Sequence, residues 1–246
     1  MSTAKFRRCH DVTKTWEGGW SDHPADPGGK TMYGVTEAVY HAWLRQHGKP
    51  VRPVRQITIA EAEQIYFEQY WVPSGGPTLA TGVDLATYDA SVNSGVSRGR
   101  KWLLDSIGGP DHETVKRICA TRLSFMRSLN IWNTFGRGWA RRVADIEAKG
   151  VAWALTAAND NDNSDLVKQQ LGDEANKARS QAGKQTGAAA GAGGGGAISL
   201  EQGAQLGDWI LAGIAFVACA ALAFLIIRAV INSHRATAYA REAANA

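Results

Sequence analysis

The sequence predicts a mainly α-helical protein, with a folded N-terminal part, a linker and a C-terminal apolar helix. Apolar residues recur at helical spacing through most of residues 6–149, whereas strand patterns are scarce. Residues 1–158 hold eight of the nine tryptophans, and residues 209–227 form a run of nineteen without a charge. The composition, with 44% hydrophobic and 20% charged residues, is otherwise ordinary for a globular chain.

The first predicted helix runs from about Phe6 to Trp16 and stops at the glycine pair Gly18-Gly19. Glu17 therefore lies at a helix C-terminus, where the negative end of the helix dipole disfavours a charged carboxylate. A general acid needs its proton, so this position suits one. The following stretch "WSDHPADPGGKTMYGVT" contains a second glycine-rich turn, and we expect at most a short hairpin there.

Helix signals continue after this loop. Thr36 can cap a helix that ends near His47. Thr58-Ile-Ala-Glu61 has the pattern of a capping box for the segment "AEAEQIYFEQYW", which Pro73 closes. Further helices are expected in residues 85–107 with a break at Ser94-Gly95, in 113–129 and in 138–149.

The glycine-rich loop places two carboxylates and a hydroxyl close together in sequence, namely Glu17, Asp26 and Thr31. Hydrolysis of a glycosidic bond needs such a set, because one group protonates the leaving oxygen while another directs water to the anomeric carbon. The residues alone leave an alternative open. In that alternative Asp26 only starts a turn and Glu17 is a surface charge.

The run E-G-G-W, then five residues, then D-P-G-G-K-T-M-Y-G-V-T resembles the signature of the glycoside hydrolase 108 muramidases of phage endolysins and bacterial wall-editing enzymes. The stretch "ITIAEAEQIYFEQYW" is similar to the tyrosine-tryptophan helix of that domain. "YDASVNSG", "KWLLDSIG", Arg122 and "FGRGWARRV" resemble the peptidoglycan-binding domain that usually follows it. The resemblance implies a lysozyme-like helical fold with Glu17 as catalytic acid.

Asp26 and Thr31 resemble the aspartate and threonine that bacteriophage lysozymes of related design use beside their glutamate. The gap between them is one residue shorter here than in those lysozymes. The resemblance also implies a domain order: a catalytic domain at residues 6–80 and a peptidoglycan-binding-like domain at residues 81–158.

The remainder of the chain lies outside the resemblance. Residues 159–208 contain no aromatic residue and little apolar surface to offset chain entropy, so we expect a flexible linker. Residues 209–231 are long and apolar enough for one transmembrane helix, because nineteen uncharged residues roughly span a ~30 Å hydrocarbon core. A basic tail, residues 232–246, follows.

Several other side chains are candidates for substrate binding. Aromatic rings stack on the apolar faces of sugars, although aromatic residues at helical spacing more often belong to a core. A helix break can line the floor of a groove. The candidates are Trp20, Tyr33, Tyr66, Trp71, Asn93 and Gly95.

A metal site is not expected. His10, Asp22 and His23 suggest a zinc amidase at first sight, but no H-E-x-x-H or spaced ligand set accompanies them. We interpret both histidines as solvated surface residues and expect no metal or cofactor. The three cysteines have no paired spacing and predict no disulfide framework.

Charge favours a polyanionic partner. Residues 1–159 carry 20 basic and 15 acidic side chains, and residues 116–142 carry seven basic and no acidic ones. The charge alone is consistent with binding to cell wall, with binding to nucleic acid, or with a basic helix face that is simply exposed to solvent. The resemblance favours peptidoglycan glycan strands and not nucleic acid.

The apolar helix is followed by Arg228, Arg235 and Arg241 and preceded by Glu201 and Asp208. The positive-inside rule then predicts a single-pass protein of the cytoplasmic membrane, with the tail in the cytoplasm and the catalytic domain in the periplasm. The N-terminus lacks the pattern of a cleavable signal peptide. Export would therefore need a secretion machinery, or a holin that releases a cytoplasmic pool.

Together these features predict a membrane-tethered peptidoglycan hydrolase that cleaves the bond between N-acetylmuramic acid and N-acetylglucosamine. It would serve as an endolysin or in wall remodelling. Two alternatives stay open. One is a lytic transglycosylase, which forms an anhydro product, and the other is a non-catalytic wall-binding membrane anchor.

Overall fold

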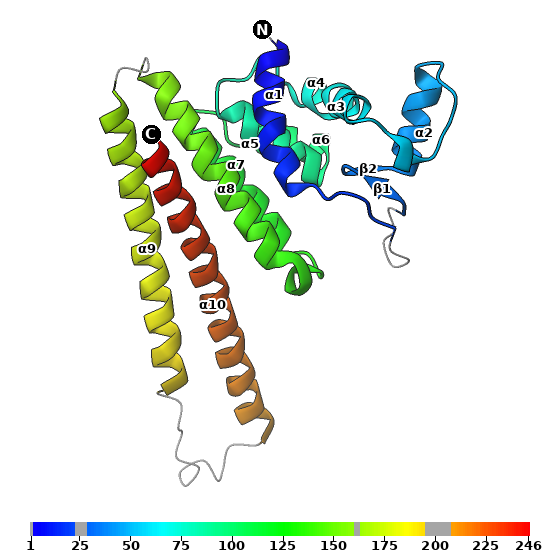
Figure 1. Ribbon diagram of the computed structural model, residues 1–246. Coiled ribbons are helices and arrows are strands. Elements are labelled where there is room, and N and C mark those ends of the chain that lie inside the picture. The colour runs from blue at the N-terminus through cyan, green and yellow to red at the C-terminus, as the bar shows by residue number, and fades with distance from the viewer. Residues whose placement is uncertain (1, 23–28, 160–162, 195–207) are drawn as a thin grey trace. The chain divides into compact units, whose positions relative to one another are not determined.

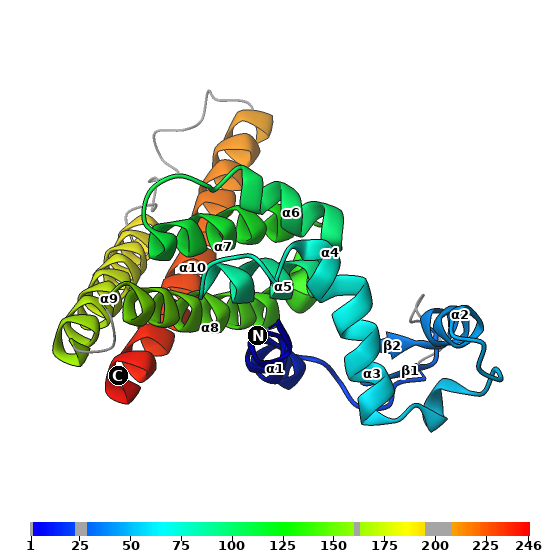
Figure 2. The ribbon, with the colours of Figure 1, turned by 90° about the horizontal axis from the view of Figure 1, so that it is seen from above.

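The computed structural model describes residues 2–22, 29–159, 163–194 and 208–246 (Figure 1). The chain divides into two compact units, residues 1–122 and 123–246, and each is described by itself. Helices make up most of both units, and a two-stranded hairpin is the sheet of the described residues (Figure 2). The predicted mainly α-helical fold is confirmed.

The first unit is built from short elements. In chain order they are α1 (Ser2–Thr13), the 3₁₀ helix Lys14–Trp16, β1 (Thr31–Met32), β2 (Val35–Thr36), α2 (Glu37–Gln46), the 3₁₀ helix Val54–Gln56, α3 (Ile59–Tyr66), the π-helix Phe67–Trp71, α4 (Val72–Ser74), α5 (Val83–Ser94), α6 (Val96–Leu104) and the start of α7 (Asp111–Arg127). The second unit contains the end of α7 and then α8 (Trp132–Ala158), α9 (Ser164–Gly194) and α10 (Asp208–Asn245).

The predicted helix signals act as expected. The Thr36 hydroxyl accepts a 3.3 Å hydrogen bond from the backbone N–H of Val39 at the start of α2. Thr58 and Glu61 form the capping box of α3. Gly95, with φ of 90°, separates α5 from α6. Local capping chemistry thus fixes where three of these helices begin or end.

The hairpin has a two-residue turn at Tyr33 and Gly34. Met32 pairs with Val35 across it, and the turn residues have φ of 52° and 74°. Positive φ at both positions is the geometry of a type I′ turn, which matches the twist of two antiparallel strands. Tyr33 is the one non-glycine residue with positive φ among those described, so this turn carries backbone strain.

An aromatic cluster forms the core next to α1. The ring of Phe6 lies 5.9 Å from Trp71 and 6.0 Å from Tyr88, and Trp71 lies 5.6 Å from Tyr88 between ring centres. These residues belong to α1, the π-helix and α5. Their packing joins α1 to the π-helix and to α5.

The second unit differs from the sequence prediction. Residues 159–208, expected to be a flexible linker, contain the 31-residue helix α9. Its buried side chains Val167, Leu171, Ala175 and Ala178 recur at helical spacing and give it a face to pack. Lysine, glutamine, leucine and alanine are also good helix formers. The low apolar content therefore did not exclude an ordered helix, because one narrow stripe of apolar residues is enough to pack a helix against its neighbours.

Helix α10 runs without a break from Asp208 to Asn245 and packs side by side with α9 (Figures 1 and 2). The predicted transmembrane helix and the predicted separate tail are thus one element. Among the described residues, its part Cys219–Asn245 is long and apolar enough to cross a membrane.

Candidate active site

Glu17 lies immediately after the 3₁₀ helix that ends the α1 segment. Its backbone is extended, with φ of −91° and ψ of 142°, and its N–H donates a 3.1 Å hydrogen bond to the carbonyl of Lys14. The predicted position at a helix end is confirmed. The Oε1 atom of its carboxyl group is buried.

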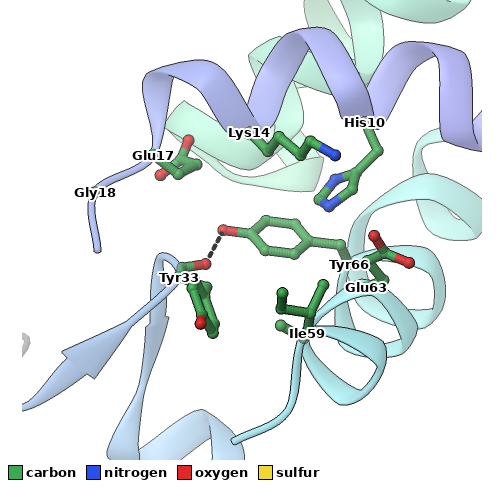
Figure 3. Close-up of a pocket in the computed structure, with 9 residues that line it drawn as sticks. His10, Lys14, Glu17, Gly18, Tyr33, Ile59, Glu63 and Tyr66 are labelled. Atoms are coloured by element: carbon green, nitrogen blue, oxygen red, sulfur yellow. Dashed lines mark hydrogen bonds between the residues drawn. The ribbon is translucent and has the colours of Figure 1, made fainter. Parts of the chain in front are cut away.

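Glu17 lines a pocket of about 240 Å³ with residues of three segments (Figure 3). The α1 segment contributes His10, Lys14, Glu17 and Gly18, the hairpin contributes Tyr33, and α3 contributes Ile59, Ala62, Glu63 and Tyr66. Positions 10, 14 and 17 follow helical spacing, so one face of the first helical segment forms one wall. Positions 59, 62, 63 and 66 form the other wall in the same way.

The hairpin turn is held against Glu17 by Tyr66. The Tyr66 hydroxyl donates a 3.0 Å hydrogen bond to the backbone carbonyl of Tyr33 (Figure 3). Gly34, the next residue, lies close to both Tyr66 and Glu17: a Cβ atom there would lie 2.2 Å from the Tyr66 hydroxyl and 3.0 Å from Oε2 of Glu17. The turn therefore approaches the carboxyl group as closely as only glycine allows.

His10 is buried in the wall of the pocket, which corrects the interpretation of this residue as a surface histidine. Its Nδ1 lies 2.9 Å from the Tyr88 hydroxyl, and its ring stacks on Phe6 at 5.1 Å. Burial lowers the pKa of His10 to about 4, and the positive charge of Lys14 acts in the same direction. His10 is therefore neutral at pH 7.

The surroundings of Glu17 are aromatic and partly dry. Burial raises the pKa of Tyr70, and the negative charge of Glu17 adds to that effect. Burial also raises the pKa of Tyr88. Both phenols thus stay protonated at neutral pH and can serve only as neutral hydrogen-bonding groups.

The pocket contains a second carboxylate, Glu63, which no sequence motif indicated. Glu63 projects from α3 and is half-buried. The position of Glu63, four residues after Ile59 and three before Tyr66, could have shown that it shares a helix face with Tyr66. His10 and Lys14 likewise precede Glu17 at helical spacing, which indicates that they lie on the same face as Glu17.

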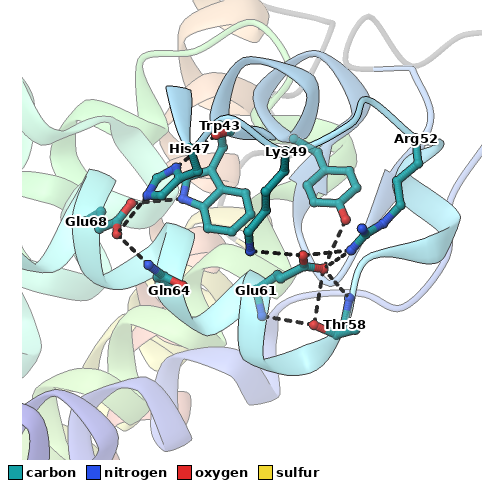
Figure 4. A network of polar contacts seen from close by, with 9 residues as sticks. Trp43, His47, Lys49, Arg52, Thr58, Glu61, Gln64 and Glu68 are labelled. Atoms are coloured by element: carbon teal, nitrogen blue, oxygen red, sulfur yellow. Dashed lines mark hydrogen bonds and ion pairs between the residues drawn. The ribbon is translucent and has the colours of Figure 1, made fainter. Parts of the chain in front are cut away.

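A polar network fixes the start of α3 and so this wall of the pocket (Figure 4). Glu61 accepts hydrogen bonds from Tyr40 at 3.0 Å, from Arg52 at 2.6 Å and from the Thr58 backbone at 3.1 Å. Burial acts to raise the pKa of Glu61, but these hydrogen bonds outweigh it and lower the pKa to about 2. In the π-helix that follows α3, Glu68 accepts a 2.9 Å hydrogen bond from the Trp43 indole.

The predicted catalytic residues are placed as follows. Glu17 lines the pocket, whereas Asp26 lies outside the described residues. Thr31 is in β1, where its hydroxyl donates a 3.0 Å hydrogen bond to the carbonyl of Gly29, and it is not among the pocket-lining residues.

The predicted substrate-binding residues fall into three groups. Tyr33 and Tyr66 line the pocket. Trp20 is 38% exposed, and the Arg55 guanidinium lies 5.0 Å from its ring centre. Trp71 is fully buried in the aromatic cluster, which corrects its assignment as a sugar-stacking residue.

Asn93 and Gly95 lie at the end of α5 and do not line the described pocket. The side-chain oxygen of Asn93 accepts a 3.1 Å hydrogen bond from Arg122. The same arginine forms a buried ion pair of 2.6 Å with Asp89. Asn93 thus takes part in a structural network that holds α5 to α7.

Comparison with known proteins agrees with this arrangement. The family model of glycosyl hydrolase 108 matches residues 10–95, the segment that includes every pocket-lining residue. A solved structure of SagA from Brucella abortus is similar to this chain, with 32% sequence identity and a TM-score of 0.54. The match covers 62% of this chain and 97% of that one. A search of curated proteins finds no match.

The matched segment of the family model ends where α5 ends, so the peptidoglycan-binding domain expected at residues 81–158 stays a prediction. The signature around Glu17 and the helices that form its pocket are within the match. This chain belongs to the glycosyl hydrolase 108 family.

Proposed function

We propose that this protein hydrolyses the glycosidic bond between N-acetylmuramic acid and N-acetylglucosamine in peptidoglycan, with Glu17 as the general acid. Membership of the glycosyl hydrolase 108 family supports a peptidoglycan hydrolase. The observation that carries the assignment of Glu17 is its place in the pocket: its carboxyl group is partly buried, at the end of a helical segment, beside neutral aromatic groups.

In this mechanism Glu17 donates its proton to the glycosidic oxygen as the bond to the anomeric carbon breaks. A second group must direct water, or its own oxygen, onto that carbon. The family resemblance supports Asp26 with Thr31 for this role, while its place in the pocket supports Glu63. Charged carboxylates of this kind also stabilise the positive charge that develops on the sugar ring.

The sugar-binding surface would include Tyr33 and Trp20, whose rings are accessible enough to stack on a pyranose face. The basic segment 116–142 and the break at Gly95 would contribute to wall binding outside the catalytic pocket. No metal or cofactor is required by this chemistry.

We further propose that α10 attaches the enzyme to a membrane. Only 17% of the most apolar window of Cys219–Asn245 is buried, whereas the core helix of a soluble protein is mostly buried. Peptidoglycan lies outside the cytoplasmic membrane, so the outer face of that membrane is the place where an attached enzyme would reach its substrate. A holin or a secretion machinery would provide the route.

Mass spectrometry of the products released from purified sacculi by the full chain tests the glycosidase. Hydrolysis gives reducing muramic acid ends, a lytic transglycosylase gives anhydro ends, and a wall-binding anchor gives no soluble products. We expect hydrolysis. Anhydro products or no cleavage would contradict the proposal.

Conservative variants assign the roles. Glu17→Gln should lower the rate by roughly 10²–10⁴-fold, because it removes the proton donor with little change of shape. Glu113→Gln, at a surface glutamate of α7, is the matched control and should cleave like the wild type. Comparing Asp26→Asn with Glu63→Gln then identifies the second group as the one whose loss is more severe.

A further inference from the structure

Trp20 and Arg55 form a pair of side chains on the surface of the first unit. The guanidinium carbon of Arg55 lies 5.0 Å from the centre of the Trp20 indole ring, and both residues are exposed. Trp20 keeps 38% of its surface accessible despite this contact. A cation–π contact between exposed groups contributes little to stability, so the fold alone gives a weak reason for the pair.

The backbone next to Trp20 is attached to the hairpin. Ser21, the following residue, pairs with Thr31 of β1 through two backbone hydrogen bonds of 2.9 Å. On the other side, Gly18 lines the pocket of Glu17, and the two residues of chain from Gly18 to Trp20 span at most about 7 Å. The backbone of Trp20 is therefore close to the pocket and fixed to the strand that carries Thr31.

The backbone at Arg55 is also held in place. Arg55 belongs to the 3₁₀ helix Val54–Gln56, which contacts β1. Val54 and Ile57 are buried on either side of it. The backbone N–H of Val54 donates a 3.1 Å hydrogen bond to the carboxylate of Glu37 at the start of α2. A fixed turn thus presents the exposed side chain of Arg55 next to the hairpin.

Arg55 differs from its cationic neighbours in having no anionic partner within the part of the chain that the structure describes. Arg52 donates a 2.6 Å hydrogen bond to Glu61, and Lys49 lies 3.5 Å from the same carboxyl group. The contact of Arg55 with the Trp20 ring is an attraction between charge and π-electrons, so it leaves the guanidinium N–H groups available as donors. A guanidinium in this state is suited to bind a carboxylate of a ligand through two parallel hydrogen bonds.

The proposed substrate supplies such a carboxylate. N-acetylmuramic acid is N-acetylglucosamine with an added lactyl ether that ends in a carboxyl group. This group is a free carboxylate in glycan strands without stem peptides, and otherwise it carries a peptide that itself ends in carboxylates. The apolar face of the sugar ring can stack on an indole. A tryptophan beside an unpaired arginine therefore matches the acidic sugar of the strand better than the neutral one.

We propose that Trp20 and Arg55 form a subsite for the carboxylate-bearing sugar of the glycan strand, in which the indole stacks on the sugar ring and the guanidinium binds the carboxylate. The proposal rests on the function proposed above and adds a specificity to it. Because the two sugars alternate along the strand, recognition of one of them sets the register of the strand. The register decides which of the two kinds of glycosidic bond is placed at Glu17.

Equilibrium binding tests the subsite without relying on cleavage. The full chain with Glu17→Gln is titrated by calorimetry with soluble glycan fragments, one series without stem peptides and one with them, each before and after its carboxyl groups are converted to neutral amides. Amidation should weaken binding by roughly 10-fold or more, since a charge-assisted hydrogen bond is lost. A loss in the peptide-free series assigns the lactyl carboxylate, and a loss confined to the other series assigns the stem peptide. Equal binding of charged and amidated fragments in both series would overturn the proposal.

Variants at Arg55 assign the charge recognition. Arg55→Gln should bind charged fragments as weakly as amidated ones, whereas Arg55→Lys, which keeps the charge but not the planar pair of donors, should retain part of the difference. Arg45→Gln, at an exposed arginine of α2, is the matched control and should discriminate like the parent chain. Discrimination that survives in Arg55→Gln, or that is lost equally in Arg45→Gln, would show a general attraction of a basic protein for an anion and would overturn the subsite.

Variants at Trp20 test the stacking. Trp20→Ala should weaken the binding of charged and amidated fragments alike, since stacking does not depend on the charge of the substituent, and Trp20→Phe should restore most of it. Unchanged affinity in Trp20→Ala would overturn the role of the indole. Cleavage of sacculi by the wild type is measured in parallel. A wild type that does not cleave while charge discrimination is present would refute the glycosidase and leave the subsite standing, and cleavage without discrimination would do the reverse.

Discussion

The hydroxyl of Tyr66 donates a 3.0 Å hydrogen bond to the backbone carbonyl of Tyr33, a residue held at a positive φ of 52°. This bond connects α3 with the strained turn of the hairpin that approaches Glu17. Two segments that are distant in sequence are thereby held together beside the proposed proton donor. The pocket depends on tertiary contacts as much as on the signature loop.

Tyr66→Phe should lower kcat by about 5-fold while leaving the fold intact. It removes one hydrogen bond, worth about 1 kcal/mol, and lets the turn move relative to Glu17. Tyr40→Phe is the matched control, since it also removes a tyrosine hydroxyl that donates a 3.0 Å hydrogen bond, but to Glu61 in the network behind α3. Steady-state kinetics on soluble glycan fragments and thermal unfolding should show similar stability losses but a kcat loss at Tyr66 alone. Equal kcat in both variants would contradict a positioning role.

Gly34→Ala adds only one methyl group, but it should strongly lower both the stability and the activity of the protein. The new Cβ would come within 2.2 Å of the Tyr66 hydroxyl and 3.0 Å of the Glu17 carboxyl group, at a φ of 74°. We expect a loss of roughly 2–3 kcal/mol in the free energy of unfolding and a strongly reduced rate. Gly48→Ala is the control that distinguishes backbone strain from steric clash. Gly48 has a similar φ of 64°, but there is open space around it. Urea unfolding should show a loss of only about 1 kcal/mol there. Matching losses at the two positions would refute the close approach.

The sequence predicted those features that local chemistry decides. The capping residues Thr36 and Thr58, the break at Gly95 and the position of Glu17 at a helix end all follow from backbone preferences of neighbouring residues. Each confirmed prediction rests on a signal contained within a few residues.

Predictions that depended on tertiary packing were less accurate. Trp71 and His10 looked like surface or substrate residues, but both are covered by residues from other helices, with Tyr88 in contact with each. Helix α9 was missed because its five buried apolar residues stabilise the helix only when they pack against partner helices. In a single sequence the partners of these residues are unknown, so periodicity alone cannot tell an open face from a covered one.

Glu61→Gln should destabilise the catalytic unit by about 2 kcal/mol at pH 7, because the buried oxygens lose their charge-assisted hydrogen bond from Arg52. The wild type should also lose stability in acid. The pKa of Glu61 is lowered to about 2, so the unfolded chain takes up the proton first, and the contribution is lost as pH falls from about 4.5 to 2. Urea unfolding between pH 7 and 3 measures both effects. Glu113→Gln should change stability by less than about 1 kcal/mol, since its ion pair with Lys116 is at the surface. A Glu61→Gln variant as stable and as acid-sensitive as the wild type would disprove the role of this network.

The buried imidazole of His10 predicts a second and separate acid-sensitive range. Its pKa is lowered to about 4 from an ordinary 6.5, chiefly by burial, so the folded protein resists a proton that the unfolded chain accepts. The unfolded state therefore binds more protons between these two values, and stability should fall as pH drops from about 6.5 to 4, by up to about 3 kcal/mol. In His10→Gln the baseline stability is lower, because the stacking on Phe6 is lost, but the decline over this range should disappear. NMR titration of the His10 ring gives the direct measurement, and its midpoint should lie near 4. A His10 midpoint near 6.5 would show that the ring is hydrated, and the wall of the pocket next to Glu17 would then be open to water rather than closed by α1.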